Sequence, residues 1–178
     1  YHERDPRAFD GYLMRELPVI HGLSQASGAE WFVIKTLCEL DRIPQILDFF
    51  HAPQCIWIYR GYRDVANSML VSFRSVPDTV RRMAELGPDA GWWGAGMSPD
   101  TQALLRRLTA RPLSDHSLSA LMWYARNVLF LEQGLQNNSR GTLCRYETLV
   151  TRPEEEGERL CTPLGLPFRA GYVRGITG

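Results

Sequence analysis

The sequence predicts an α/β fold with a parallel sheet flanked by helices, and three features carry this prediction. Two short apolar runs rich in β-forming residues, WFVIK (31–35) and CIWIY (55–59), are typical of buried strands. Each run is followed by a helical pattern, as in residues 41–50. A third run, TLCRY (142–146), predicts another strand. Strand, helix, strand and helix within about 45 residues indicate right-handed βαβ units.

Length and composition favour one globular domain over residues 1–178. The chain has 178 residues, of which 44% are hydrophobic and 22% charged. Twenty basic and twenty acidic residues give a net charge of zero, which argues against nucleic-acid binding through many phosphate contacts. No apolar run approaches the ~20 residues of a membrane span. The four cysteines form no CxxC pair, so we expect no metal site, reduced thiols and, with no signal peptide visible, a cytoplasmic protein.

The other expected elements are helical or irregular. A short helix is expected over residues 12–20, interrupted by Pro18. Residues 75–100 contain many glycines and prolines around Trp92 and Trp93, which indicates a lid or a loop on the substrate side. Further helices are predicted over residues 63–73, 100–110, 117–136 and 153–161.

A phosphate pocket is predicted where the strand 55–59 ends. Arg60 follows the strand, and a helix begins about three residues later. Ligands of parallel sheets bind at the carboxyl ends of strands, and a helix N-terminus offers free N–H groups to an anion. Arginine adds a planar fork of donors. Ser68, one helical turn after Asp64, can donate its hydroxyl to the same anion.

This segment resembles the 3′-phosphate-binding motif of the sulfotransferases. That family has a strand, an arginine, a turn and a serine eight residues after the arginine, as Arg60 and Ser68 are here. Lys35 stands about 25 residues before Arg60, as the active-site lysine of the family does. CRYETLV (144–150), followed by LGLP (164–167), resembles a later segment of the family. The resemblance covers roughly residues 31–168 and implies a P-loop NTPase-like sulfotransferase fold.

The resemblance implies sulfuryl transfer from 3′-phosphoadenosine-5′-phosphosulfate (PAPS), which leaves 3′-phosphoadenosine 5′-phosphate (PAP). Arg60 and Ser68 would bind the 3′-phosphate, and Tyr146 would lie beside the adenine. Lys35 would be catalytic, stabilising charge on the transferring group. The acceptor would be a hydroxyl or amine of a small molecule or glycan, and no metal is required.

The sequence also departs from the family pattern. Gly61 and Tyr62 replace the usual Asp-Pro pair, and Leu37 stands where many members have a histidine base. The glycine-rich loop that holds the 5′-phosphosulfate is not recognisable, and we expect it upstream of residue 1. Candidates for the general base, by residue type alone, are Asp10, His21 and Glu39.

Two other functions remain open. A P-loop kinase acting on a nucleotide or small metabolite would share the sheet but would need a Walker-type loop and usually magnesium. A degenerate sulfotransferase would bind 3′-phosphoadenosine without turnover, an alternative that Leu37 keeps open. The oligomeric state has no signature in the sequence.

Overall fold

The protein is described here by a computed structural model that covers residues 9–36, 38–73 and 75–176. The chain divides into two compact units, each considered by itself. One contains residues 1–51 and 78–112, and the other contains residues 52–77 and 113–178. The structure is mostly helical with a small parallel sheet, so the broad α/β class is confirmed. The prediction that residues 1–178 form a single domain stays a prediction.

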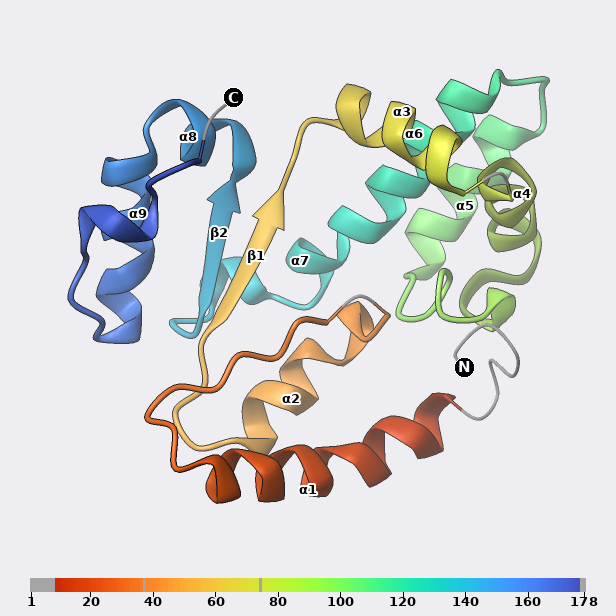
Figure 1. The fold of residues 1–178 in the computed structure, drawn as a ribbon. Helices are drawn as coiled ribbons and strands as arrows, with labels where there is room; N and C mark the ends of the chain where they lie inside the picture. The colour runs from red at the N-terminus through yellow and green to blue at the C-terminus, as the bar shows by residue number, and fades with distance from the viewer. Residues whose placement is uncertain (1–8, 37, 74, 177–178) are drawn as a thin grey trace. The chain divides into compact units, whose positions relative to one another are not determined.

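The first unit is helical wherever it has regular structure among the described residues (Figure 1). Its helices are α1 (Phe9–Ser27), α2 (Ile43–Phe49), α4 (Val76–Leu86, which begins just before this unit) and α5 (Pro99–Thr109). Pro18 lies inside α1 and does not end it. No helix in the described part of the chain combines the length and the apolar character needed to cross a bilayer.

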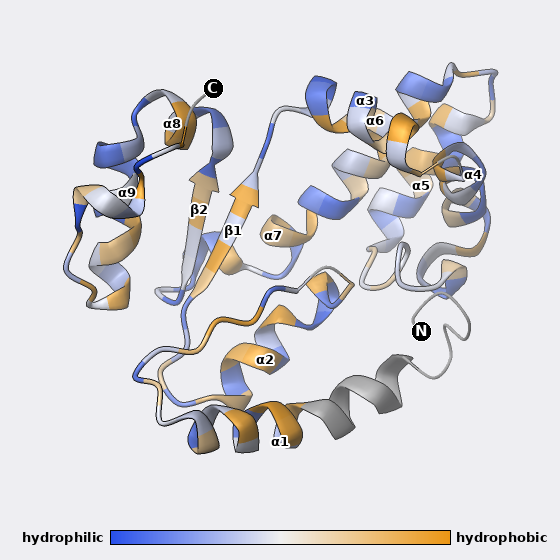
Figure 2. Ribbon diagram, in the orientation of Figure 1, coloured by the Kyte–Doolittle hydropathy of each residue, from blue (hydrophilic) through white to orange (hydrophobic). Residues whose placement is uncertain are grey.

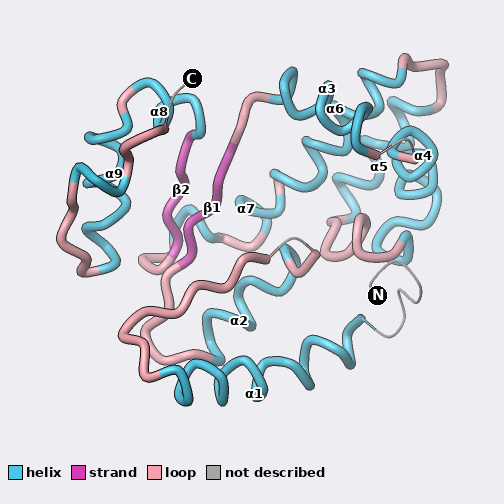
Figure 3. The backbone as a smooth tube through the Cα atoms, viewed as in Figure 1, coloured by secondary structure: helices cyan, strands magenta, loops and turns pink. Residues whose placement is uncertain are grey.

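The strand predicted over residues 31–35 is wrong. The connection between α1 and α2 is loop in Figure 3, and no strand lies within the described residues there. Trp31 and Phe32 are about half exposed, and Val33 is 87% exposed. An apolar run becomes a strand only when a neighbouring strand takes up its backbone hydrogen bonds, and this run has no such neighbour among the described residues.

The irregular loop predicted over residues 75–100 is also wrong in its first half. Residues 76–86 form helix α4, with Val76, Val80 and Met83 buried along one face. Pro77 is the second residue of this helix, where a missing N–H costs nothing. The long helix predicted over residues 117–136 is instead broken into α6 (Asp115–Asn127) and α7 (Leu129–Glu132).

The second unit contains the sheet. Its strands are β1 (Cys55–Tyr59) and β2 (Gly141–Arg145), and its further helices are α3 (Tyr62–Ser72), α8 (Tyr146–Thr151) and α9 (Pro153–Cys161). The strands pair in parallel, from Cys55 beside Gly141 to Tyr59 beside Arg145. Two of the three predicted strands are therefore confirmed, at 55–59 and, shifted by one residue, at 142–146.

The sheet is held by packing on both of its faces. Strand β1 is largely apolar in Figure 2, whereas β2 is apolar only in part. Trp57 of β1 is buried with its ring 5.6 Å from that of Phe130 of α7. Cys144 of β2 is also buried, and α9 contacts β2 (Figure 1). Because β1 and β2 end side by side, the residues that follow them start from the same edge of the sheet.

Gly141 starts β2 at a place that has no room for a side chain. A Cβ atom there would lie 2.5 Å from the carbonyl oxygen of Leu135. We expect Gly141→Ala to lower the free energy of unfolding by about 1–3 kcal/mol, because backbone has to move. Gly171→Ala is the matched control, since a Cβ at Gly171 would meet no atom within 4 Å. Equal denaturation midpoints for the two variants would contradict this expectation.

Candidate functional site

The ends of the two strands bring Arg60 and Tyr146 together, although they lie far apart in the sequence. Arg60 directly follows β1, and Tyr146 directly follows β2 as the first residue of α8. The guanidinium carbon of Arg60 lies 4.7 Å from the centroid of the Tyr146 ring. At this distance the guanidinium is attracted to the ring electrons, a contact worth about 0.5–1 kcal/mol at an exposed site.

Arg60 keeps donor groups available to an anion. Its Nη2 atom lies 3.5 Å from Oδ2 of Asp64, and both side chains are largely exposed. An exposed pair of this kind contributes little to stability. The Arg60 side chain has no other hydrogen-bond or ion-pair partner among the described residues. A ligand phosphate would therefore compete only with a weak, solvated ion pair.

Ser68, the second residue predicted to bind the phosphate, lies on α3. Asp64, the partner of Arg60, lies four residues before Ser68 and hence on the same face of the helix. Ser68 is exposed, and its hydroxyl makes no hydrogen bond with the described residues. No side chain caps the start of α3. The first backbone bond of the helix runs from Val65 N–H to Gly61 O, so the N–H groups of Tyr62, Arg63 and Asp64 have no partner within the helix.

One peptide group beneath this site is held at both ends. The indole Nε1–H of Trp123, in α6, donates to the carbonyl oxygen of Arg60 over 2.8 Å. The N–H of Gly61, in the same peptide group, donates to Oε1 of Glu147 over 2.6 Å. The sequence predicts Trp123 as a core residue of the long helix, and Glu147 as a residue that orders the loop after the strand 142–146 or contacts the cofactor. It does not predict the hydrogen bonds from these side chains to the peptide group.

The surroundings of Glu147 favour the ionised form of its carboxyl group. Its hydrogen bond from the Gly61 N–H is the main cause that lowers the pKa of this carboxyl, and Arg145 acts in the same direction. Nε of Arg145 lies 3.5 Å from Oε2 of Glu147. Because the pKa is lowered in the folded state, the contribution to stability is present at neutral pH and is lost as the pH falls through the folded pKa.

Aromatic side chains border the site on the α6 side. The Trp123 ring lies 5.3 Å from the ring of Tyr59 and 6.0 Å from that of Tyr62. A shallow hollow of about 230 Å³ continues along α3 and is lined by Tyr62, Arg63, Ala66, Asn67 and His116. The carboxyl end of β1 is therefore bordered by the aromatic rings of Tyr59, Tyr62 and Trp123.

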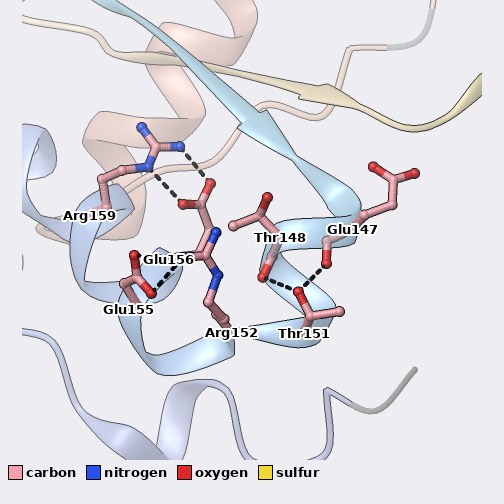
Figure 4. A network of polar contacts seen from close by, with 7 residues as sticks. All are labelled: Glu147, Thr148, Thr151, Arg152, Glu155, Glu156 and Arg159. Carbon is pink, nitrogen blue, oxygen red and sulfur yellow. Dashed lines mark hydrogen bonds and ion pairs between the residues drawn. The ribbon is translucent and has the colours of Figure 1, made fainter.

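Arg159 links helix α9 to β2 shortly before Tyr146. Glu156 is buried and accepts two hydrogen bonds from Arg159, over 2.7 and 2.5 Å (Figure 4). Arg159 also donates to the carbonyl oxygen of Leu143 in β2 over 2.7 Å. Figure 4 also shows the Thr151 hydroxyl, which donates to the carbonyl oxygen of Glu147 over 2.7 Å. The backbone that carries Tyr146 and Glu147 is thus anchored on both sides.

Lys35 and the candidate bases belong to the first unit. Lys35 is exposed on the irregular connection between α1 and α2. His21 lies on α1 with its ring 6.1 Å from that of Phe49. The side chain of Asp10 lies outside the description, as does the whole of Leu37. The assignment of Lys35 to the reacting group therefore stays a prediction. The described residues contain no group of three or more histidines, cysteines or carboxylates that could hold a metal ion.

No protein-family model matches this chain, and neither a curated protein nor a solved structure is similar to it. The candidate site therefore stands on its own geometry. That geometry places an arginine over an aromatic ring at the carboxyl edge of a parallel strand pair.

Proposed function

We propose that the ends of β1 and β2 bind the 3′-phosphate of PAPS and that the protein is a sulfotransferase. The observation that carries the proposal is the stacking of Arg60 on Tyr146, 4.7 Å from the ring centroid. The resemblance gives these two residues neighbouring parts of one nucleotide, the phosphate and the adenine. Their convergence from separate strands supports that assignment.

The proposal extends to the P-loop NTPase-like fold and to the reaction. The bond between the sulfonate and the 5′-phosphate oxygen of PAPS would break, and a bond from the acceptor oxygen or nitrogen to sulfur would form. PAP leaves, and the proton of the acceptor passes to a base. Such transfer depends on positioning and charge stabilisation. Arg60 and Ser68 would fix the donor, and Lys35 would stabilise charge on the transferring group.

Binding of PAP by the intact chain tests the proposal. We expect PAP to bind at least about tenfold more tightly than adenosine 5′-phosphate, because only PAP has the 3′-phosphate that Arg60 would contact. Isothermal titration without magnesium measures both. Equal affinities would contradict the proposal, and magnesium-dependent binding would favour the kinase alternative. A binding module without turnover would bind PAP but transfer no labelled sulfate from PAPS to any acceptor.

Ser68 provides a second prediction. Ser68→Ala removes one hydroxyl donor from an exposed helix position, so we expect affinity for PAP to fall about tenfold with the fold unchanged. Ser72→Ala is the control, because Ser72 is an exposed serine one turn further along the same helix. The two dissociation constants and the two thermal midpoints are the measurements. A loss of affinity as large in Ser72→Ala would remove Ser68 from the site.

A further inference from the structure

The peptide group between Arg60 and Gly61 is held by two side chains that are distant in the sequence. Trp123 lies 63 residues after Arg60, and Glu147 lies 86 residues after Gly61. Trp123 donates to the carbonyl oxygen of Arg60, and Glu147 accepts from the N–H of Gly61. Both ends of the peptide dipole are therefore satisfied, and the rotation of the peptide plane is fixed.

This peptide group ties the residue after Arg60 to the residue after Tyr146, because its N–H donates to Glu147. The peptide plane also sets the entry into α3, which carries Asp64, the ion-pair partner of Arg60. The carboxylate also lies close against the backbone, because a Cβ atom at Gly61 would come within 3.1 Å of Glu147 Oε1. Glycine at this position lets the carboxylate approach the N–H directly.

We propose that Trp123 and Glu147 are positioning residues that hold the Arg60 guanidinium over Tyr146, ready for an anion. The identity of the ligand in this inference rests on the proposed function. Trp123 and Glu147 together are called the peptide clamp below. Glu147 bonds only the Gly61 N–H of this turn, and Val65 is the first residue whose N–H is used within α3. The clamp therefore leaves the N–H groups of Tyr62, Arg63 and Asp64 without a hydrogen bond inside the helix.

The clamp acts on affinity by lowering the cost of ordering the site. The Arg60 side chain is 43% exposed. Asp64, its one ion-pair partner within the described part of the chain, is 62% exposed, so this contact alone would leave the Arg60 side chain loosely held. Fixing the backbone beneath it reduces the freedom that Arg60 loses when a phosphate binds. A site supported in this way binds more tightly without any added contact to the ligand.

Three variants test the clamp through PAP binding. We expect Glu147→Ala and Trp123→Phe each to weaken PAP binding about tenfold, since each frees one end of the peptide. Glu147→Gln should restore affinity to within about threefold of the unsubstituted protein, because its amide oxygen accepts the same hydrogen bond. Glu155→Ala, at an exposed carboxylate of α9, should leave PAP affinity unchanged. If Glu147→Gln binds as weakly as Glu147→Ala, the bond to Gly61 is not the cause and the proposal is overturned.

A second readout needs no ligand. A proton near the face of an aromatic ring resonates upfield, so the Arg60 Nε–H signal reports the stacking on Tyr146 by NMR. We expect this signal to move downfield in Glu147→Ala and in Trp123→Phe and to stay in place in Glu147→Gln and Glu155→Ala. An unmoved signal in both clamp variants would overturn the inference. If the unsubstituted protein does not bind PAP, the proposed function is wrong. The Arg60 Nε–H signal still tests whether Trp123 and Glu147 position Arg60.

Discussion

Replacing Arg60 with glutamate is expected to abolish binding of PAP, with a loss of at least about a hundredfold. The change removes a guanidinium that would donate charge-assisted hydrogen bonds to the 3′-phosphate, and it places a second negative charge beside Asp64. Arg60→Lys keeps the charge but loses the planar fork and the stacking on Tyr146, so we expect an intermediate loss. Isothermal titration of each variant with PAP gives the affinities, and circular dichroism checks that the helices remain.

Arg63 is the matched control for Arg60. It is an exposed arginine three residues later in the chain, and its Nε donates over 3.3 Å to the hydroxyl of the neighbouring Tyr62. Arg63→Glu makes the same change in charge without touching the contact with Tyr146. We expect a loss of less than about threefold at physiological salt, because screening weakens interactions between exposed charges. A loss equal to that of Arg60→Glu would mean that net charge, and not the stacked guanidinium, governs binding.

A large effect on stability is expected from replacing Arg159. The Glu156 side chain is only 7% exposed, and Arg159 donates two hydrogen bonds to it. Arg159→Met removes both of these charge-assisted bonds, leaves the carboxylate only the weak thiol donor of Cys144 among the described residues, and also removes the bond to the Leu143 carbonyl. Breaking a buried pair from one side costs about 3–5 kcal/mol. Since Arg159 is itself 47% exposed, water can reach the gap, and we expect a loss of about 2 kcal/mol in the free energy of unfolding.

A second arginine of the same region provides the control for this measurement. Arg152 pairs with Glu155 over 3.2 Å, again three residues apart, but both side chains are mostly exposed. Arg152→Met is therefore expected to change the free energy of unfolding by less than about 1 kcal/mol. Chemical denaturation compares the two variants. Equal midpoints would show that the pair between Glu156 and Arg159 does not stabilise the fold.

The loss of unfolding free energy in Arg159→Met should also depend on pH. Hydrogen bonding from Arg159 is the main cause that lowers the pKa of Glu156. A lowered pKa in the folded state gives stability that is present above the unfolded pKa and is lost as the pH falls through the folded pKa. The difference between the unsubstituted protein and Arg159→Met is therefore expected to shrink below about pH 4. A difference that stays constant as the pH falls would contradict this account.

Sequence patterns predicted those strands that have a neighbour. The runs at 55–59 and 142–146 pair with each other and carry residues buried on both faces. The run at 31–35 has the same composition but no strand beside it among the described residues, and it is exposed. Pairing partners lie outside any local window, so apolar character alone does not separate these cases. Pro77 misled the prediction of α4 because its position in the first turn, and not its presence, decides its effect.

The sequence predicted Arg60 and Tyr146 as site residues, and it did not predict the hydrogen bonds that hold the backbone beside them. Arg60 and Tyr146 each follow a recognisable strand, so the parallel register that joins the strands also joins the two residues. Trp123 and Glu147 act through hydrogen bonds across 63 and 86 residues, and no local periodicity encodes such bonds. Side chains that orient a backbone group become visible only once the tertiary structure brings them together.

A structure of the intact protein in complex with PAP tests the central claim most directly. The account predicts the 3′-phosphate within hydrogen-bonding distance of both the Arg60 guanidinium and the Ser68 hydroxyl, with the adenine beside Tyr146. A 3′-phosphate bound elsewhere, or Arg60 and Ser68 pointing away from each other in the complex, would contradict it.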